Sequence, residues 1–321
     1  MRSMRRRALL TPAVAGLVLV AAACSSPSEV SGEATSSSGS PSGSGGGELV
    51  VGGSSASEMS IMQNVYAELL RAKGYTVTIK PAGERAVYAA ALESGDVDVV
   101  PEYAASMAEY LNKTVNGEAA APIATSEAAA TVAAMRPLAE QRGLTVLEPA
   151  QARNSNGFYV TKAFSEENGV TTLSQLAALG RPVVLAAGDD CVENTFCQPG
   201  LERVYGLQVA DVTGDPYGSA SAKQKVVAGT AQLGLTGTTD GTLAAQDLVL
   251  LEDDKGLQAA DNLVPVVNTE QAGDPEIAEA LDALADVLTT EDLAEMNVAV
   301  DGERRKPEDV AKEYVESAGL L

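Results

Sequence analysis

Hydroxyl side chains gather in three short segments of this chain, each placed directly after an apolar run. The segments span residues 52–57, 101–106 and 236–241. Their candidate binding residues are Ser54, Ser55, Ser57, Tyr103, Ser106, Thr236, Thr238, Thr239 and Asp240. Hydroxyl groups and the free N–H groups of helix N-termini hold small polar or charged molecules. We find no nucleophile paired with a base, and Glu102 has no matched second carboxylate, so we predict a binding protein and not an enzyme.

Composition excludes several classes of function. The 321 residues include no His and no Trp, which rules out His-ligated zinc and His-dependent catalytic triads. The chain has 44 Asp and Glu residues against 22 Lys and Arg, a net charge of −22. Nucleic-acid binding needs clustered basic residues, so it is disfavoured. We expect no metal, no cofactor and no nucleic-acid partner.

Strand and helix patterns alternate along the chain after residue 47. A strand at 48–53 precedes a helix with apolar residues at 62, 65, 69 and 70, and a strand at 75–80 follows it. Further helices are expected at 84–94, 126–143 (kinked at Pro137), 173–179, 199–205 and 221–228, and further strands at 97–100, 144–147, 157–160, 182–186, 209–212 and 232–235. This order predicts an α/β fold of mostly parallel sheets with helices on both faces.

Two segments follow the same plan, which suggests two similar lobes. Residues 94–103 and 228–237 each read as the end of a helix, a Gly, a strand and a loop. In open α/β sheets, ligands bind beyond the C-terminal ends of the strands. The three hydroxyl-rich segments are therefore expected to line one cleft between the lobes.

The N-terminus has the order of an export signal. Four arginines within residues 2–7 precede an apolar stretch at 8–23, which ends in small residues before Cys24. We interpret 1–23 as a signal peptide. The Ala-Ala-Ala-Cys end resembles a bacterial lipobox, which implies that Cys24 is lipidated; ordinary cleavage with a free Cys24 is the alternative. Residues 24–47, rich in Ser and Gly, read as a flexible tether. The expected location is extracytoplasmic, on the cell membrane through the lipid.

Cys191 and Cys197 lie six residues apart in a polar loop. An exported chain favours a disulfide between them. A metal-binding pair and a catalytic redox pair are the alternatives. The neighbouring acidic residues Asp189, Asp190 and Glu193 are interpreted as a solvated loop, with a cation site as the alternative.

A family resemblance extends from about residue 49 to the C-terminus. The segments that carry it, in collinear order, are 51–58, 91–103, 199–207, 238–241 and 247–256. They resemble substrate-binding proteins of ABC transporters for osmoprotectants such as glycine betaine, carnitine and choline. The resemblance implies a two-lobed type II periplasmic-binding-protein fold, with lobe 1 at 48–152 plus 243–321 and lobe 2 at 153–242. A hinge between the lobes closes on the ligand.

The resemblance also implies how the protein works. It would capture a quaternary ammonium compound and deliver it to a membrane permease with its ATPase, as a monomer. One alternative is a polar non-quaternary solute, such as an amino-acid derivative, bound by the same fold. Another is a surface lipoprotein that senses a ligand without transport.

The family holds a trimethylammonium head in a cage of aromatic rings. Tyr103 matches a cage tyrosine, and Ser106 matches a hydroxyl that meets the ligand carboxylate. The other cage positions fall at Gly237 and, near Asn156, at Gly157 or Phe158. Tyr88 and Tyr217 are candidates to restore aromatic surface.

The cationic side chains that bind a ligand carboxylate in the family are replaced here. Ser54 and Asn194 occupy their positions, so Arg85 or backbone N–H groups would have to act instead. A buried carboxylate without such partners is costly. The sequence therefore favours a ligand that lacks a carboxylate, such as choline, or a more polar, hydroxyl-rich solute.

Overall fold

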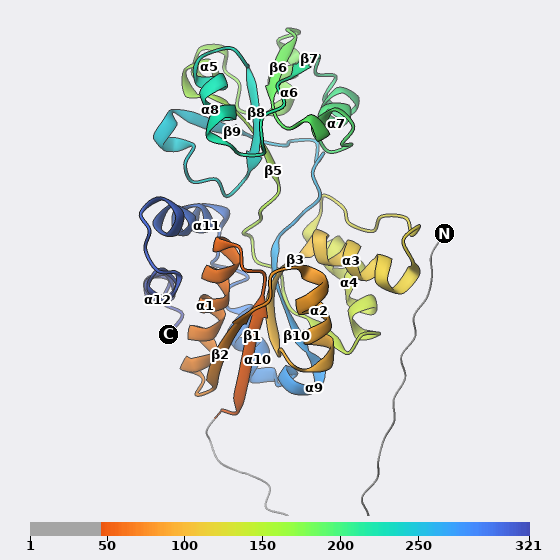
Figure 1. The fold of residues 1–321 in the computed structure, drawn as a ribbon, viewed down its shortest axis with the longest axis vertical. Coiled ribbons are helices and arrows are strands. Elements are labelled where there is room, and N and C mark those ends of the chain that lie inside the picture. Colours follow the sequence, from red (N-terminus) through yellow and green to blue (C-terminus); the bar gives the residue numbers. More distant parts are fainter. Residues whose placement is uncertain (1–45) are drawn as a thin grey trace, which may run out of the picture. The chain divides into compact units, whose positions relative to one another are not determined.

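The computed structural model describes residues 46–321, in which the chain forms two five-stranded sheets (Figure 1). The predicted signal peptide, Cys24 and nearly all of the tether lie outside the described residues. The first sheet has the order β2-β1-β3-β10-β4 and the second β7-β6-β8-β5-β9. Four strands of each sheet run in one direction, while β10 and β5 run opposite. The predicted α/β class and the mostly parallel sheets are confirmed.

Strand bounds follow the alternation of apolar residues. The first sheet, which defines lobe 1, contains β1 (Glu48–Gly53), β2 (Thr76–Pro81), β3 (Val99–Tyr103), β4 (Leu144–Val146) and β10 (Leu263–Asn268). The second sheet, which defines lobe 2, contains β5 (Asn156–Thr161), β6 (Val183–Ala186), β7 (Val209–Val212), β8 (Leu233–Gly237) and β9 (Leu248–Leu251).

Helices cover both faces of the first sheet. Around lobe 1 lie α1 (Ser57–Ala72), α2 (Arg85–Ser94), α3 (Ala104–Asn116), α4 (Ala128–Glu140), α9 (Thr269–Ala272), α10 (Pro275–Asp282), α11 (Thr290–Asn297), η4 (Val298–Gly302) and α12 (Pro307–Ser317). Adjacent strand residues such as Val99 and Val100 enter different clusters, one with α1, α10, α11 and α12 and one with α2, α3 and α4. Successive strand side chains point to opposite faces, which explains this division.

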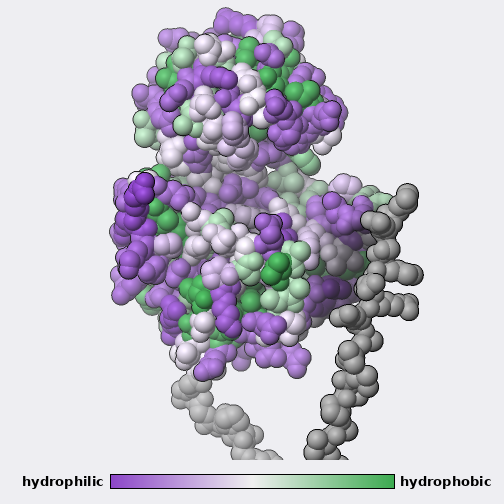
Figure 2. All heavy atoms as spheres, viewed as in Figure 1, coloured by the Kyte–Doolittle hydropathy of each residue, from purple (hydrophilic) through white to green (hydrophobic). Residues whose placement is uncertain are grey.

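Lobe 2 is built from shorter helices. They are α5 (Lys162–Asn168), α6 (Leu173–Ala178), η1 (Asp189–Val192), α7 (Gln198–Gly200), η2 (Leu201–Tyr205), α8 (Ala220–Val227) and η3 (Ala244–Gln246). Its main core contains Phe158, Leu185 and Leu233 of the sheet with Leu173 and Leu201. None of the helices among residues 46–321 is long and apolar enough to cross a membrane. Hydrophilic residues predominate on the face shown in Figure 2.

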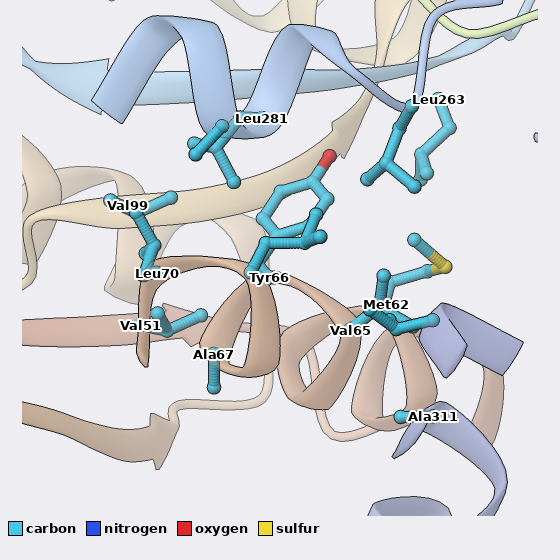
Figure 3. Packing of buried hydrophobic residues seen from close by; sticks show 14 of the residues in the cluster. Val51, Met62, Val65, Tyr66, Ala67, Leu70, Val99, Leu263, Leu281 and Ala311 are labelled. Atoms are coloured by element: carbon cyan, nitrogen blue, oxygen red, sulfur yellow. The ribbon is translucent and has the colours of Figure 1, made fainter. Parts of the chain in front are cut away.

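Helix α1 anchors the core of lobe 1. Met62, Val65, Tyr66, Leu69 and Leu70 recur at helical spacing and are buried. Figure 3 shows the Tyr66 ring pointing from α1 toward side chains of the sheet and of α10, such as Leu281, while Ala311 of α12 lies in the same cluster but away from the ring. This packing fixes the start of α1, and with it Ser57 and Glu58.

The two sheets share one topology. β3 and β8 both occupy the third place, flanked by β1 and β10 in one sheet and by β6 and β5 in the other. The predicted equivalence of segments 94–103 and 228–237 is thus confirmed. The loops at their C-terminal ends become equivalent walls of the site.

Three features differ from the sequence-based expectations. Helix α3 begins directly after β3 and was not predicted, and α4 continues through Pro137. Residues 248–251 were assigned to lobe 1, but they form β9, which pairs with β5 in the second sheet. We therefore propose that the chain returns to lobe 1 at 252–262 and not at 243.

The core of lobe 1 makes a testable prediction. Val65 is fully buried, whereas Val87 on α2 is 56% exposed. Val65→Ala should lower the free energy of unfolding by about 1–3 kcal/mol, because it removes two methyl groups and leaves a cavity. Urea denaturation measures this, with Val87→Ala as the matched control, expected within about 0.5 kcal/mol of wild type. Equal losses in both variants would contradict the packing described for α1.

Candidate ligand-binding site

Three hollows meet at Asn154, on the segment that joins β4 to β5. Their volumes are about 490, 420 and 370 Å³. Asn154 lines all three, Tyr217 lines the first two and Glu58 the last two. Because residues of both sheets contribute to the walls, the hollows form one cleft, at the strand ends where the sequence analysis placed it.

Glu58 is a cleft carboxylate whose hydrogen-bond donors come from three separate parts of the chain. It lies in the first turn of α1, where the helix N-terminus stabilises negative charge, and is 8% exposed. It accepts hydrogen bonds from the Tyr103 hydroxyl, from Asn154 Nδ2 at 3.1 Å and from Asn297 Nδ2 at 2.6 Å. Burial and the nearby charge of Glu58 raise the pKa of Tyr103, so the phenol keeps its proton and donates it. Within residues 46–321, Glu58 forms no ion pair.

Glu102, at the end of β3, is bound by a fork of donors. Its side chain is 1% exposed and receives Arg85 Nε at 2.8 Å and Arg85 Nη2 at 3.0 Å. The Tyr88 hydroxyl donates to it at 2.6 Å. Burial and the neighbouring carboxylate raise the pKa of Tyr88. The guanidinium of Arg85, our candidate clamp for a ligand carboxylate, is therefore already paired with a carboxylate of the protein.

Asp261 occupies the donors of Ser106 in the same way. Its carboxylate accepts the Ser106 backbone N–H at 2.8 Å and the Ser106 hydroxyl at 2.7 Å, in the first turn of α3. Helix N-termini favour such anions. Burial raises the pKa of Asp261 above its usual range, although both bonds to Ser106 oppose this. The hydroxyl expected to meet a ligand carboxylate thus meets Asp261 instead.

Asp240 organises the loop after β8. It pairs with the buried Lys223 and accepts hydrogen bonds from the Thr236 and Thr242 hydroxyls, both at 2.6 Å. Burial raises the pKa of Asp240, but these partners outweigh it and hold the pKa below its usual value. The backbone oxygen of Thr239 accepts a bond from Asn297 at 3.3 Å.

Most predicted residues line the cleft. Ser54, Arg85 and Tyr103 line the 370 Å³ hollow. Ser57, Thr236, Thr239 and Asp240 line the 420 Å³ hollow. Ser106 and Asn156 line the 490 Å³ hollow.

Three predicted residues lie elsewhere. Ser55 is exposed outside the hollows, and Thr238 binds the backbone at Arg153 and Ser155. Phe158 was predicted as a cage residue, and this prediction is wrong. Its side chain is 1% exposed in the lobe 2 core, because the alternation of side chains along β5 turns it inward. A Cβ at Gly157 would lie 2.7 Å from Leu250 Cδ2, so a larger residue there would require the Leu250 side chain to shift.

Sequence reasoning missed several residues of the cleft. Asn154, Asn297 and Asp261 reach it from separate segments and carried no motif. Glu58 stood in a recognised segment but was not chosen. Phe196, directly before Cys197, lines the 490 Å³ hollow. The sulfur atoms of Cys197 and Cys191 lie at bonding distance, with Cα atoms 5.2 Å apart. In the described part of the chain, no group of three His, Cys, Asp or Glu side chains is arranged to hold a metal ion.

Comparisons with known proteins agree on one family. Residues 47–317 match the model of the substrate-binding domain of ABC-type glycine betaine transport systems. A glycine-betaine-binding protein of Pseudomonas aeruginosa is 27% identical over 85% of this chain and 88% of its own length. The glycine betaine-binding protein YehZ of Escherichia coli is 26% identical over 84% of this chain and 90% of its own.

Solved structures show the same fold. Apo YehZ from Escherichia coli superposes with a TM-score of 0.74 at 25% identity, over 85% of this chain and 99% of that one. A glycine betaine/carnitine/choline ABC transporter structure gives a TM-score of 0.74 at 21% identity, over 85% of this chain and 98% of that one. The predicted two-lobed type II periplasmic-binding-protein fold is confirmed.

The Arg85–Glu102 pair generates a stability prediction. Arg85→Met should lower the free energy of unfolding by about 2–4 kcal/mol, because it leaves the buried Glu102 carboxylate without its cation. Chemical denaturation at neutral pH measures the loss. Adding Glu102→Gln to Arg85→Met should recover part of it, since the amide is neutral. If the double variant were as unstable as the sum of the single ones, the two side chains would not be coupled.

The low pKa of Asp240 predicts a pH dependence. A carboxyl group whose pKa is lower in the folded chain stabilises the fold above about pH 4, and this contribution is lost as pH falls through the folded pKa. The stability difference between wild type and Asp240→Asn should therefore be largest near neutral pH and shrink in acid. Denaturation curves at several pH values test this, with Asp211→Asn at an exposed position as control. A difference independent of pH would contradict the pairing with Lys223.

Proposed function

The chain belongs to the family of substrate-binding domains of ABC-type glycine betaine transport systems, and from this premise we propose that it captures a quaternary ammonium solute without a carboxylate, such as choline. The family is one of binding proteins and not of enzymes, as the sequence predicted. In our proposal the solute is held between the two lobes and handed to a permease with its ATPase.

One observation carries the choice of ligand. The two candidate sites for a ligand carboxylate, Arg85 and Ser106, are already occupied by Glu102 and Asp261 of the protein itself. A carboxylate brought beside them would meet like charge in a partly buried cleft. Glu58 and Asp261 form no ion pair within the described chain, so a cation would gain attraction from both. Lys113 also lines the cleft, but at its exposed rim, beside Glu109.

The hinge supports a binding-and-closure mechanism. The two connections between the sheets, 147–155 and 252–262, are bonded to one another through Asn154 N–H to Asp261 O at 3.1 Å and Ser155 Oγ to Ala259 O at 3.0 Å. Asn154 and Asp261 also line the cleft. A ligand that contacts these two residues binds at the hinge itself, so it can favour the closed arrangement.

We further propose that the protein is exported and attached to the membrane by a lipid on Cys24, with residues 24–47 as its tether. The order of basic, apolar and small residues before Cys24 supports this. An extracytoplasmic location also favours a disulfide between Cys191 and Cys197, whose sulfur atoms lie at bonding distance.

Calorimetric titration of residues 46–321 tests the ligand class, after bound solute has been removed by unfolding and refolding. Choline should bind at least about tenfold more tightly than glycine betaine, a difference of about 1.4 kcal/mol. The reason is that the betaine carboxylate meets Glu102 and Asp261. Proline betaine, carnitine and several amino acids serve as comparison ligands.

Tighter binding of glycine betaine would overturn the proposed ligand, and Lys113 and Arg85 would then be the first residues to replace. Binding of an amino acid with no heat from any quaternary ammonium compound would favour the polar non-quaternary solute instead.

A further inference from the structure

Lobe 2 touches α11 of lobe 1 at a point outside the two connecting segments. Gly241, in the loop after β8, lies so close to α11 that a Cβ built on it would overlap the backbone oxygen of Ala294 and the side chain of Val298. Gly241 does not have a positive φ, so its backbone conformation alone would admit other residues. The Ala294 oxygen accepts the Val298 N–H within the helix and cannot turn aside. Gly is therefore required at 241 by the closeness of the two lobes.

Asn297, on the same face of α11, joins the two lobes through its amide. Asn297 and Val298 follow Ala294 by three and four residues, the spacing of neighbours on one helix face. Asn297 Nδ2 lies 2.6 Å from Glu58 Oε2 in lobe 1 and 3.3 Å from the backbone oxygen of Thr239 in lobe 2. An amide nitrogen carries two hydrogens, so it can donate to both acceptors. One side chain thus links a carboxylate of the cleft to the opposite lobe.

The orientation of this amide has a cost. Asn297 Oδ1 is buried and has no hydrogen-bond partner within residues 46–321, an arrangement that destabilises a fold. The reverse orientation would place Oδ1 against two oxygen acceptors, Glu58 Oε2 and Thr239 O, with no hydrogen between them. The two acceptors therefore determine which way the amide points. An apolar side chain would avoid the cost, and polar groups retained in spite of it are expected at functional sites.

The residues of this contact border one part of the cleft. The 420 Å³ hollow is lined by Glu58, Thr239, Gly241 and Asn297. Glu58 receives its hydrogen bonds from Tyr103, Asn154 and Asn297. Among these three donors, only Asn297 also donates to the loop after β8 in the described part of the chain. A cation bound beside Glu58 therefore depends on the contact between α11 and lobe 2.

We propose that Asn297 is a positioning residue for the cation-binding site: it holds the Glu58 carboxylate in place and, together with Gly241, fixes it to lobe 2. This inference rests on the proposed function, in which Glu58 attracts the ligand. Binding then depends on a second contact between the lobes, in addition to the hinge. The ligand meets a carboxylate and two lobes that are already arranged, which reduces the entropy lost on binding.

Calorimetric titration with choline and tetramethylammonium, on the domain of residues 46–321 stripped of bound solute, tests the role of the amide. Asn297→Leu keeps a similar side-chain volume but removes the donor, so choline should bind about 5- to 30-fold more weakly. Gly241→Ala should have a similar effect, because its methyl group pushes the loop away from α11. The two losses should not add in the double variant, since both substitutions remove the same contact.

Two variants serve as matched controls. Asn64→Leu makes the same exchange in α1, at an amide whose nitrogen donates within the helix, to Ser60 O at 2.8 Å. Gly302→Ala adds the same methyl group in η4, where a Cβ would lie 3.6 Å from Val298 Cγ1, an ordinary contact. Both controls should bind choline within about twofold of wild type.

A second measurement separates positioning from a loss of stability. Spin labels on Val87→Cys in lobe 1 and Val227→Cys in lobe 2, both at exposed positions, report the distance between the lobes without ligand. The distribution of distances should broaden in Asn297→Leu and Gly241→Ala and stay as in wild type in both controls. The thermal unfolding midpoint of Asn297→Leu should stay near that of wild type, because removing the unpaired Oδ1 offsets the lost donor.

The outcomes distinguish this inference from the proposed function. If wild type binds choline and both variants keep its affinity, the role of Asn297 is overturned and the proposed function stands. Weaker binding with an unchanged distribution of distances, or with losses that add in the double variant, contradicts the link to lobe 2. Failure of the folded wild-type protein to bind choline or tetramethylammonium overturns the proposed function and this inference together.

Discussion

A carboxylate in the wall of a protein cleft must be hydrogen-bonded or paired, because water no longer solvates it. Glu58, Glu102 and Asp261 all lie in this position, and each is held by hydrogen-bond donors; those of Glu58 and Asp261 come from distant parts of the chain. Tyr103, Asn154 and Asn297 converge on Glu58, from the end of β3, the hinge and α11. The cleft therefore exists only when the two sheets, the hinge and the C-terminal helices are assembled.

The same bonds give the cleft its chemical character. Arg85 and Lys223 are each paired with a carboxylate, whereas Glu58 and Asp261 are held by neutral donors. Neutral donors stabilise a carboxylate without cancelling its charge. The wall consequently stays attractive to a cation, and in the proposed mechanism Asn154 and Asp261 connect that attraction to closure of the lobes.

The two sheets share one strand order, and this determines where the loops meet. The segments after β1 and β3 in lobe 1 and after β8 in lobe 2 reach the cleft from the C-terminal ends of their strands, and β3 and β8 hold the same place in their sheets. Their hydroxyl groups serve two purposes: Ser57 lines the cleft, while Thr236 stabilises Asp240 inside its own loop. Thr238 ties the loop to the hinge. A hydroxyl-rich loop thus predicts the place of a site more reliably than the role of each hydroxyl.

The sequence by itself determined the α/β class, most strands and helices, the equivalence of 94–103 and 228–237, and the three loops of the cleft. These features depend on apolar periodicity and on Gly and Pro positions, which are local. The sequence analysis missed α3. It also placed Phe158 in the site, because which face of β5 is buried depends on the elements that pack against it. Only the tertiary structure brought Asp261 to Ser106, 155 residues away, and Asn297 to Glu58, 239 residues away. Such pairings leave no pattern in the chain, since they arise from how the sheets, hinge and helices pack.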